Sequence, residues 1–328
     1  MNSAVRLPFP VLVADIGGTN ARFALKPAAG APLSAPVRLG TAGFATPEAA
    51  VETALAAGGF ARPRSLLIGA AGPVKDRAVH LTNANWTLDG PRLIRALGLD
   101  QGLLFNDFET LALALPALGA GDLATIGAGR GDGGTRLAIG PGTGLGVGAL
   151  APAGAAWLPL SSEGGHIGLA PRGRDERALF DRLAGAGVPL QGEHLLAGPA
   201  LGRIHAALTG AAATPEAITA GAIGDEPAAR ATITVWLDLL ARFCGDMALT
   251  FLATGGVYLA GGILPRVAGL IDPARFRARF ADNSVHAALL GRLPVHLITA
   301  AEPALAGLGA LADGPERYLI DYPARLWR

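Results

Sequence analysis

Apolar residues along the chain fall into short continuous runs and longer stretches with helical spacing, which predicts mixed α/β structure. Residues 11–14 and 65–70 form runs with the length of buried strands. Residues 227–253 instead carry apolar positions three and four apart, the spacing of a helix with one buried face. The apolar positions of this long predicted helix are Val235, Trp236, Leu239, Leu240, Phe243, Met247 and Phe251.

Further strands and helices follow from the same patterns and from residues that start and stop helices. A helix over 47–57 is predicted to begin after Thr46, with Pro47 in the first helical position, where the missing N–H of proline is not needed. Another helix over 109–118 is predicted to bend or end near Pro116. The other predicted strands are 21–25, 103–105, 137–139, 147–150 and 257–260, and the other predicted helices are 90–97, 176–183 and 201–208, with a helix or turn near Pro265.

Two of these patterns occur twice in the chain. A strand, a glycine turn and a second strand occupy 11–25 and again 137–150, and a strand followed by a turn of small residues occupies 66–73 and again 257–265. Chance recurrence is the competing interpretation, because the chain contains 47 glycines. The order of the motifs and the flanking strands repeat as well, which favours two similar halves that bind one ligand from both sides.

Length and composition narrow the function classes. A chain of 328 residues is long enough for a large core and for two domains. Its net charge of +1 argues against nucleic-acid binding, which needs a clustered basic face. Cys244 is the sole cysteine, so a disulfide framework and a thiolate zinc cluster are excluded. It lies on the apolar face of the predicted helix over 227–253, where we expect a buried, inert thiol.

Two long uncharged windows, 137–162 and 247–265, resemble membrane spans in their hydropathy alone. Glycines and prolines interrupt the first, and glycines divide the second into a helix end, a turn and a strand. The first residues show only a short apolar run after Arg6 and no small-residue cleavage site of a signal peptide. We therefore expect a soluble cytoplasmic protein without membrane contact.

The first glycine turn lies in the segment VLVADIGGTN. Gly17 and Gly18 let backbone N–H groups converge on an anion, and Thr19 and Asn20 add side-chain donors. Asp15 would repel a phosphate directly, so its presence implies a divalent cation between the two. Mg²⁺ keeps several waters and bridges one or two carboxylates to phosphate oxygens. The segment therefore predicts a site for a magnesium polyphosphate.

The second glycine turn, GPGTGLG, supplies Gly142, Thr143 and Gly144. Other phosphate and nucleophile motifs do not match the chain. The P-loop pattern G-x-x-x-x-G-K-[ST] is absent, and neither Lys26 nor Lys75 lies in a glycine loop. The glycines of the second turn do not fit G-x-G-x-x-G, which disfavours a dinucleotide fold, and G-x-S-x-G of the α/β-hydrolases is missing.

The segment FNDF offers a candidate base. Asn106 followed three residues later by Glu109 fits a capping box, a purely structural role. That interpretation leaves Asp107 unexplained. A carboxylate beside a helix N-terminus is expected to be kept ionised by the helix dipole, and an ionised carboxylate can accept a hydroxyl proton.

Two further segments carry polar groups suited to a polyol. SSEGGHIGLAP contains Glu163 and His166, and QGEHLLAGP contains Glu193. Glu163 and His166 could be half of a di-metal site, but that needs a helix and a second copy, and the intervening glycines disfavour the helix. An acceptor beside a donor/acceptor suits vicinal sugar hydroxyls better. Glu193 is a further acceptor or, alternatively, only a residue at the start of a helix.

Taken together, these motifs resemble the bacterial ATP-dependent glucokinases of the hexokinase/actin-like superfamily over nearly the whole chain. DIGGTNARFAL is similar to the first phosphate hairpin of that family, GPGTGLG to the second, and LAGGI, with Gly261 and Gly262, to its adenosine-binding segment. FNDF is similar to the segment with the catalytic Asp. SEGGH and GEHLLAGPAL are similar to the sugar-binding segments. These motifs also occur in the order found in the family.

The resemblance implies ATP-dependent phosphorylation of D-glucose to glucose 6-phosphate, the first step of glycolysis, by a homodimer with Mg²⁺. It implies an actin-like, ribonuclease H-like fold with a cleft between a small domain, 1–116 joined by a C-terminal helix over about 308–328, and a large domain, 117–307. Asp107 would be the catalytic base. The glucose ligands would be Asn106, Asp107, Glu163, His166 and Glu193. The ATP-binding residues would be Asp15, Gly17, Gly18, Thr19, Asn20, Gly142, Thr143, Gly144, Gly261 and Gly262. Asp15 would also hold Mg²⁺ through water.

The chain departs from the related repressor/ORF/kinase group, which typically has a cysteine-rich zinc motif after its E-x-G-H segment, since Cys244 stands alone. Only about ten residues precede the first predicted strand, too few for a DNA-binding helix-turn-helix. A kinase for fructose, mannose or an N-acylated amino sugar remains an alternative, as does a sugar sensor without turnover. A sensor would need neither Asp15 nor Asp107. Asn83 in LTNANW is a candidate for a loop over the sugar or for a structural turn.

Overall fold

The computed structural model describes residues 5–81 and 84–328, which divide into two compact units. Unit 1 consists of Met1–Leu118, Leu150–Ser161 and Ala300–Arg328, and unit 2 of Gly119–Ala149 and Ser162–Thr299. The sequence placed its domain boundaries after residues 116 and 307. Unit 1 additionally contains 150–161 and 300–307.

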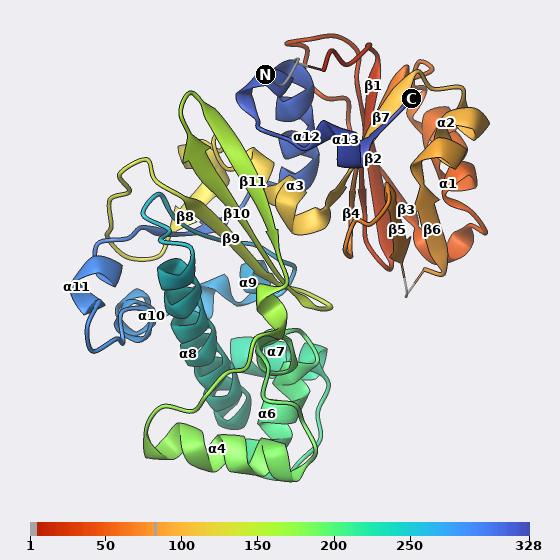
Figure 1. The fold of residues 1–328 in the computed structure, drawn as a ribbon. Helices are drawn as coiled ribbons and strands as arrows, with labels where there is room; N and C mark the ends of the chain where they lie inside the picture. The colour runs from red at the N-terminus through yellow and green to blue at the C-terminus, as the bar shows by residue number, and fades with distance from the viewer. Residues whose placement is uncertain (1–4, 82–83) are drawn as a thin grey trace. The chain divides into compact units, whose positions relative to one another are not determined.

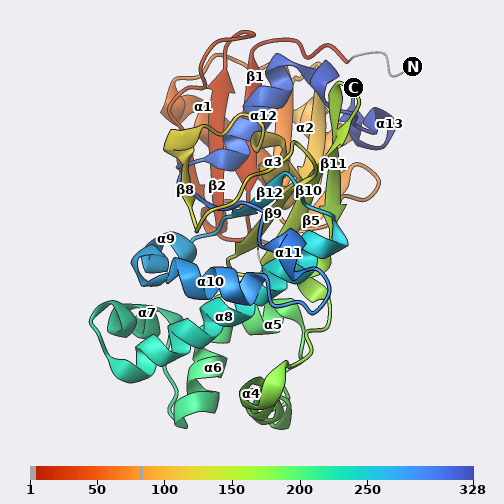
Figure 2. The ribbon, with the colours of Figure 1, turned by 90° about the vertical axis from the view of Figure 1, so that its left-hand side faces the viewer.

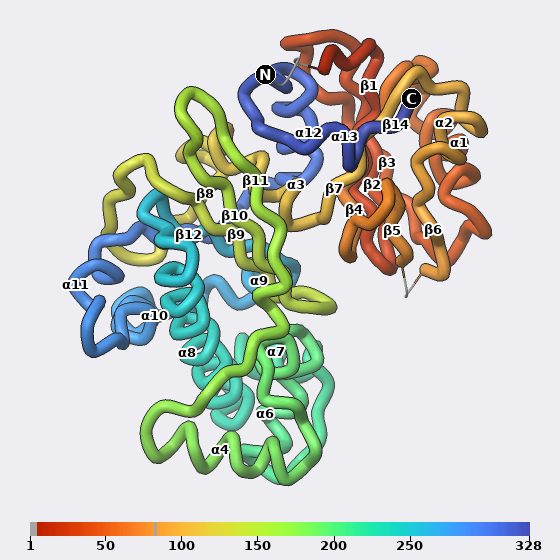
Figure 3. Tube along the Cα trace, viewed as in Figure 1, coloured from red at the N-terminus to blue at the C-terminus, as the bar shows by residue number. Residues whose placement is uncertain are grey.

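Unit 1 is built on a first sheet with the strand order β14-β7-β4-β1-β2-β3. The strands β1, β4 and β7 are parallel, and their register places Ile16, Ala70 and Asn106 side by side at one edge. The strand β14 pairs antiparallel with β7, so the C-terminal end of the chain lies beside residues 102–103 (Figure 3). The strands are β1 Val11–Ile16, β2 Asn20–Lys26, β3 Val37–Gly40, β4 Ser65–Ala70, β7 Gln101–Asn106 and β14 Leu326–Trp327, with a separate ribbon of β5 Ala78–Leu81 and β6 Trp86–Asp89.

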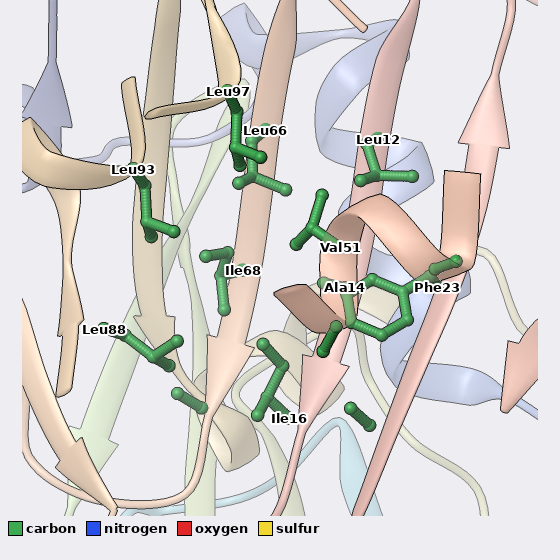
Figure 4. Packing of buried hydrophobic residues seen from close by; sticks show 14 of the residues in the cluster. Leu12, Ala14, Ile16, Phe23, Val51, Leu66, Ile68, Leu88, Leu93 and Leu97 are labelled. Atoms are coloured by element: carbon green, nitrogen blue, oxygen red, sulfur yellow. The ribbon is translucent and has the colours of Figure 1, made fainter. Parts of the chain in front are cut away.

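Helices cover both faces of the first sheet (Figure 1). Because side chains alternate along a strand, β1 sends Leu12, Ala14 and Ile16 into the core beneath α1 and α2 (Figure 4). Val11 and Val13 point to the other face, beneath α3 and α12. The helices are α1 Pro47–Gly58, α2 Gly90–Leu97, α3 Asp107–Ala114, α12 Pro303–Asp313 and α13 Tyr322–Arg325, with 3-10 turns at η1 Thr41–Gly43 and η5 Pro315–Arg317.

A second sheet has the strand order β11-β10-β9-β12-β13-β8. Its strands β9, β12 and β13 are parallel, and β8 pairs antiparallel with β13 at the edge. Residues 150–161 of the β10–β11 hairpin belong to unit 1. The strands are β8 Leu123–Thr125, β9 Arg136–Pro141, β10 Leu145–Ala153, β11 Ala156–Ser162, β12 Gly256–Leu259 and β13 Val295–Ile298.

The predicted internal repeat is confirmed by the topology of the two sheets. In the first sheet, β1 has its hairpin partner β2 on one side, and on the other side lie the parallel strands β4 and β7 and the antiparallel edge strand β14. In the second sheet, β9 has its hairpin partner β10 on one side, and on the other side lie the parallel strands β12 and β13 and the antiparallel edge strand β8. The glycine turns 17–19 and 142–144 therefore occupy equivalent places in the two sheets. The predicted strands and their turns were correct to within a few residues.

Helices dominate the rest of unit 2. The helix α8, Pro227–Thr250, has α5, α6, α7 and α10 packed around it (Figure 2). Cys244 lies inside this packing, where burial raises the pKa of its thiol far above the usual range, as expected for an inert residue. The other helices are α4 Gly173–Gly185, α5 Gly192–Leu196, α6 Ala200–Thr209, α7 Pro215–Ile223, α9 Leu264–Val267, α10 Pro273–Phe280 and α11 Ala287–Leu290, with 3-10 turns at η2 Ala120–Asp122, η3 Gly164–His166 and η4 Ala268–Leu270.

Two predicted helices need correction. The helix predicted over 109–118 is α3, which begins at Asp107 and ends at Ala114, before Pro116. The predicted C-terminal helix over 308–328 is wrong beyond Asp313, because Gly314 and Pro315 end α12 and the chain continues as short turns and the strand β14. None of the helices formed by residues 5–81 and 84–328 combines the length and the apolarity needed to cross a membrane.

Candidate functional site

The edge of the first sheet brings the first glycine turn and the FNDF segment together. Carboxyl ends of parallel strands meet at one edge, and the register aligns Asp15 on β1 with Gly69 on β4 and Phe105 on β7. Asp15 lies on the α3 face of the sheet, since it follows Val11 and Val13 in the alternation along β1. Asp107 is the first residue of α3, so both carboxylates belong to the same edge and the same face.

Asp15 is paired with a residue that was not predicted. Arg22 lies directly opposite Asp15 in the β1–β2 hairpin, and its Nη1 donates to Asp15 Oδ2 at 2.9 Å. The Nε of Arg22 lies 3.2 Å from an oxygen of Glu302, at the start of α12. Burial raises the pKa of Asp15, and Arg22 offsets only part of this effect. Counting residues across the predicted hairpin would have identified Arg22 as the cross-strand partner.

Asp107 has a pKa raised to about 7. Burial is the largest cause and the negative charge of Asp15 the next, while the hydrogen bond that Phe108 N donates to Asp107 Oδ1 at 3.0 Å acts in the opposite direction. The expectation that the helix dipole keeps Asp107 fully ionised is therefore wrong, because desolvation and like charge outweigh the helix N-terminus. A pKa near the working pH is suited to a general base.

Asn106 holds the start of α3 in place. Its Oδ1 accepts from Phe108 N at 2.9 Å and from Glu109 N at 3.3 Å, and its Nδ2 donates to Gly72 O at 3.2 Å. The predicted cap is confirmed, and the Glu109 carboxylate also pairs with Arg325. Asn106 thereby orients the residue that follows it, Asp107.

The first glycine turn is a closed loop with an exposed tip. Gly17 N donates to Asn20 O at 2.9 Å, and Asn20 Nδ2 donates to Thr19 Oγ1 at 3.0 Å. Thr41, which was not predicted as a site residue, holds the turn through two hydrogen bonds. Its backbone N donates to Thr19 O at 3.0 Å and its hydroxyl donates to Gly18 O at 2.8 Å.

The second glycine turn lies beside the LAGGI segment in unit 2. Gly142 N donates to Gly144 O at 2.8 Å, and Thr143 at the tip is exposed. Gly261 has φ +98°, and a Cβ there would lie 2.2 Å from Pro141 O, so only glycine fits between β12 and the end of β9. Gly261 and Gly262 are therefore held next to the second turn, with both residues exposed.

The three predicted sugar ligands of unit 2 lie on two neighbouring segments. Glu163 precedes η3 and His166 ends it, and their side chains, 68% and 51% exposed, approach to 3.7 Å between Oε2 and Nε2. Glu193 lies in α5, and its Oε2 accepts a hydrogen bond from Leu145 N at 3.1 Å. Gly192 N donates to Ile167 O at 2.9 Å, which joins the two segments.

The predicted site residues thus form two groups. Unit 1 holds Asp15, Gly17, Gly18, Thr19, Asn20, Asn106 and Asp107, and unit 2 holds Gly142, Thr143, Gly144, Glu163, His166, Glu193, Gly261 and Gly262. Within each group, hydrogen bonds or close backbone contacts connect the segments. Asn83 lies outside the described residues.

The residues around Asp15 fit a magnesium ion that is held mainly by a nucleotide. In the described part of the chain, no three His, Cys, Asp or Glu side chains are grouped to hold a metal ion. Mg²⁺ at phosphate sites needs only one or two carboxylates besides phosphate oxygens and water. Arg22 bonds one oxygen of Asp15, Oδ2, and does not occupy the other, Oδ1.

Comparisons with known proteins agree with this arrangement. The family model described as glucokinase matches residues 12–314. A glucokinase from Rhizobium etli (strain CIAT 652) is 37% identical over 335 residues, covering 100% of this chain and 98% of that protein. The crystal structure of a glucokinase from an Antarctic psychrotroph superposes with a TM-score of 0.82 at 33% identity, covering 93% of this chain and 99% of that one.

A more distant structure shares the fold. The ROK family glucokinase from Streptomyces griseus, solved with glucose and AMPPNP, has a TM-score of 0.64 at 22% identity and covers 93% of this chain and 99% of its own. The actin-like α/β fold of the sugar kinases that the sequence predicted is confirmed by these matches. Since both the family model and relatives above 30% identity extend over nearly the whole chain, this protein belongs to the glucokinase family.

Proposed function

We propose that Asp107 is the general base in ATP-dependent phosphorylation of D-glucose to glucose 6-phosphate. The activity itself follows from membership of the glucokinase family over the full chain length. The observation that supports the role of Asp107 is its pKa of about 7, at the start of α3 and beside Asp15. A group with this pKa is substantially ionised at neutral pH and still basic enough to accept a hydroxyl proton.

The proposed chemistry needs one proton transfer and one displacement. The glucose 6-hydroxyl gives its proton to a carboxylate oxygen of Asp107 while the hydroxyl oxygen attacks the γ-phosphorus. The bond from that phosphorus to the β-phosphate oxygen breaks, and ADP leaves with the bonding electrons. Positioning and charge stabilisation supply most of the rate acceleration in this reaction class.

The sugar is proposed to be held by hydrogen bonds from both groups of site residues. Asn106 has an amide group that donates and accepts, Glu163 and Glu193 accept, and His166 does either. These side chains differ in exposure, and Glu163 and His166 are open to solvent without sugar. The proposed ligands are Asn106, Asp107, Glu163, His166 and Glu193.

The nucleotide is proposed to use both glycine turns. Backbone N–H groups and the hydroxyls of Thr19 and Thr143 would donate to phosphate oxygens, and Gly261 and Gly262 would lie against the adenosine. Asp15 would hold Mg²⁺ through water. When bound, Mg²⁺ neutralises phosphate charge and orients the γ-phosphoryl group. The Streptomyces griseus protein was solved with AMPPNP, an ATP analogue, which agrees with ATP as the donor.

A panel of hexoses tests this function. ADP release is measured with glucose, fructose, mannose and N-acetylated amino sugars at equal concentration. Glucose is expected to give the highest kcat/KM. A higher value for another hexose would reassign the substrate. If no sugar gave ADP release, the remaining interpretation would be a sugar sensor without turnover. Asp15 and Asp107, which a sensor does not need, favour the enzyme.

Assembly and location are part of the same proposal. We expect a homodimer in the cytoplasm that acts at the first step of glycolysis, and no interaction with nucleic acid or membrane. A net charge of +1 gives no electrostatic basis for nucleic-acid binding. Light scattering of the purified protein at micromolar concentration would give the mass of a dimer, about twice 33.0 kDa, or of a monomer.

A further inference from the structure

Glu193 connects the proposed sugar site to the proposed phosphate turn in unit 2. Its Oε2 accepts the hydrogen bond that Leu145 N donates at 3.1 Å, and Leu145 directly follows the second glycine turn. The same oxygen lies 2.5 Å from the position that a Cβ on Gly144 would occupy. A residue assigned to sugar binding therefore lies directly behind the turn assigned to phosphate.

The helix α5 is joined to the second turn at both of its ends. Glu193 lies at its start, and Gly198, just beyond its end, donates its N–H to Gly142 O at 2.8 Å. The indole of Trp236 on α8 donates to Leu196 O at 3.0 Å and holds α5 in the core of unit 2. Hydrogen bonds therefore join the α5 segment to residues 142 and 145, on the two sides of the turn.

The SEGGH loop is joined to the same assembly. Gly192 N donates to Ile167 O at 2.9 Å, and a Cβ on Gly165 would lie 1.9 Å from Leu145 O. The loop of Glu163 and His166, the helix of Glu193 and the phosphate turn are therefore in direct backbone contact. Close-packed backbone segments of this kind transmit small displacements, because they have no space in which to absorb them.

We propose that Glu193 couples glucose binding to nucleotide binding, by sharing its carboxylate between a sugar hydroxyl and the Leu145 N–H. This inference rests on the proposed function of the site. Oε2 holds the phosphate turn in place and Oε1 receives the sugar, so that glucose fixes the carboxylate and the carboxylate fixes the turn. Coupling of this kind is reciprocal, and the nucleotide strengthens glucose binding by the same factor.

Gly144→Ala tests the coupling from the nucleotide side. Its φ is not in the left-handed region, so alanine fits the backbone, and the new methyl group displaces the carboxylate of Glu193 from Leu145. Glucose binding is measured by tryptophan fluorescence without nucleotide. We expect the Kd for glucose to rise at least tenfold. Gly185→Ala, at the end of α4 and outside the proposed site, is the matched control, because no atom lies within 4 Å of its Cβ, and we expect its glucose Kd to stay within twofold of the wild type.

Glu193→Asp tests the coupling from the sugar side. Aspartate keeps the charge and withdraws the carboxylate from Leu145 N by the length of one methylene. Binding of Mg-AMPPNP is measured by calorimetry without sugar, and we expect a Kd several-fold above that of the wild type. A residue that only contacts the sugar would leave this Kd unchanged. Thermal unfolding of each variant shows whether it is folded at the assay temperature.

The outcomes separate the inference from the function. Weaker glucose binding in Gly144→Ala but not in Gly185→Ala, with weaker analogue binding in Glu193→Asp, supports the coupling. Equal glucose affinity in the two glycine variants, or unchanged analogue affinity in Glu193→Asp, overturns it while ADP release by the wild type with glucose leaves the proposed function intact. If Gly144→Ala does not fold, the Glu193→Asp measurement decides. An absence of ADP release by the wild type with any hexose overturns the function itself.

Discussion

Asp15 and Asp107 lie on the same face of the first sheet, and the negative charge of Asp15 helps to raise the pKa of Asp107 to about 7. They come from the ends of two strands, β1 and β7, separated by β4, and from segments more than ninety residues apart. Arg22 forms an ion pair with Asp15, whereas no ion pair among residues 5–81 and 84–328 involves Asp107. The two carboxylates therefore differ in environment, a condition that lets one hold a cation and the other move a proton.

Asp107→Asn is expected to lower kcat by about 10²- to 10⁴-fold, the contribution of a positioned general base. Asparagine has nearly the same volume and keeps the start of α3, so glucose should still raise the melting temperature of the variant. Steady-state ADP release and thermal unfolding with and without glucose measure the two effects. Retention of more than a tenth of the wild-type kcat would remove Asp107 from the role of base.

The pH profile of the wild type provides an independent measurement. Because Asp107 must be ionised to accept a proton, kcat/KM with saturating Mg-ATP is expected to fall tenfold per pH unit below a pKa of about 7. A fall in kcat/KM that begins only near pH 4, the ordinary range of an aspartate, would show that burial and Asp15 do not raise the pKa of Asp107 in solution.

The same raised pKa predicts how stability depends on pH. Between about pH 4 and pH 7 the unfolded chain has lost the Asp107 proton while the folded protein retains it, so the contribution of Asp107 to stability falls as pH rises and is lowest above pH 7. Asp107→Asn removes this contribution. The variant should therefore be more stable relative to the wild type at pH 8 than at pH 5. Urea titrations at both pH values measure this as a larger difference in the free energy of unfolding, variant minus wild type, at pH 8.

Local patterns explain which parts of this site could be predicted. The hairpin of β1 and β2, with Asp15 before the turn, and the cap of α3 at Asn106 are each encoded within at most sixteen consecutive residues. The pKa of Asp107 is not local, because it depends on the depth of burial and on Asp15, which belongs to another strand. The helix N-terminus, which local sequence does indicate, acts in the opposite direction and favours the ionised carboxylate.

Long-range pairing explains the parts that could not be predicted. The helix expected over 308–328 ends at Asp313, and Trp327 instead pairs with Gly102 on β7, about 225 residues earlier in the chain. Its indole fills the space above Gly90 and Gly102, where a Cβ would lie 2.2 and 2.4 Å from its ring atoms. No pattern within the last twenty residues indicates that these glycines form the complementary surface.

Gly69→Ala tests whether close packing of α3 on β4 positions the base. A Cβ at Gly69 would lie 2.5 Å from Thr110 Oγ1 and 3.0 Å from Thr110 Cβ. That hydroxyl donates to Asn106 O at 2.8 Å, so displacing Thr110 shifts the turn that carries Asp107. We expect a loss of about 1–3 kcal/mol in the free energy of unfolding and a lower kcat.

Two further variants identify the cause. Gly43→Ala is the matched control, since no atom lies within 4 Å of its Cβ, and it should change neither quantity. The double variant Gly69→Ala/Thr110→Ala removes the clashing hydroxyl and should recover part of both losses, which a double-mutant cycle would record as coupling. Additive effects would mean that Thr110 does not transmit the strain.

Arg325→Met tests the contact between the C-terminal segment and α3. Arg325 Nη1 lies 2.7 Å from Glu109 Oε2, and the Glu109 side chain is only 1% exposed, so its charge has no access to water. Removing one partner of a buried pair leaves the other uncompensated, and we expect a loss of about 3–5 kcal/mol in the free energy of unfolding at pH 8. Arg62→Met, which breaks the exposed pair with Glu52, is the control and should cost under about 1 kcal/mol.

The pH dependence of this loss distinguishes charge from packing. Burial already raises the pKa of Glu109 and Arg325 lowers it, so without Arg325 the folded protein retains the Glu109 proton to higher pH than the unfolded chain does. The deficit of Arg325→Met should therefore be smaller at pH 5 than at pH 8, and Arg325→Met/Glu109→Gln should recover much of it at pH 8. Arg325 also lies over the ring of Phe105, 5.2 Å from its centroid. A deficit that is equal at both pH values would mean that this packing contact, rather than the ion pair with Glu109, is what Arg325 contributes.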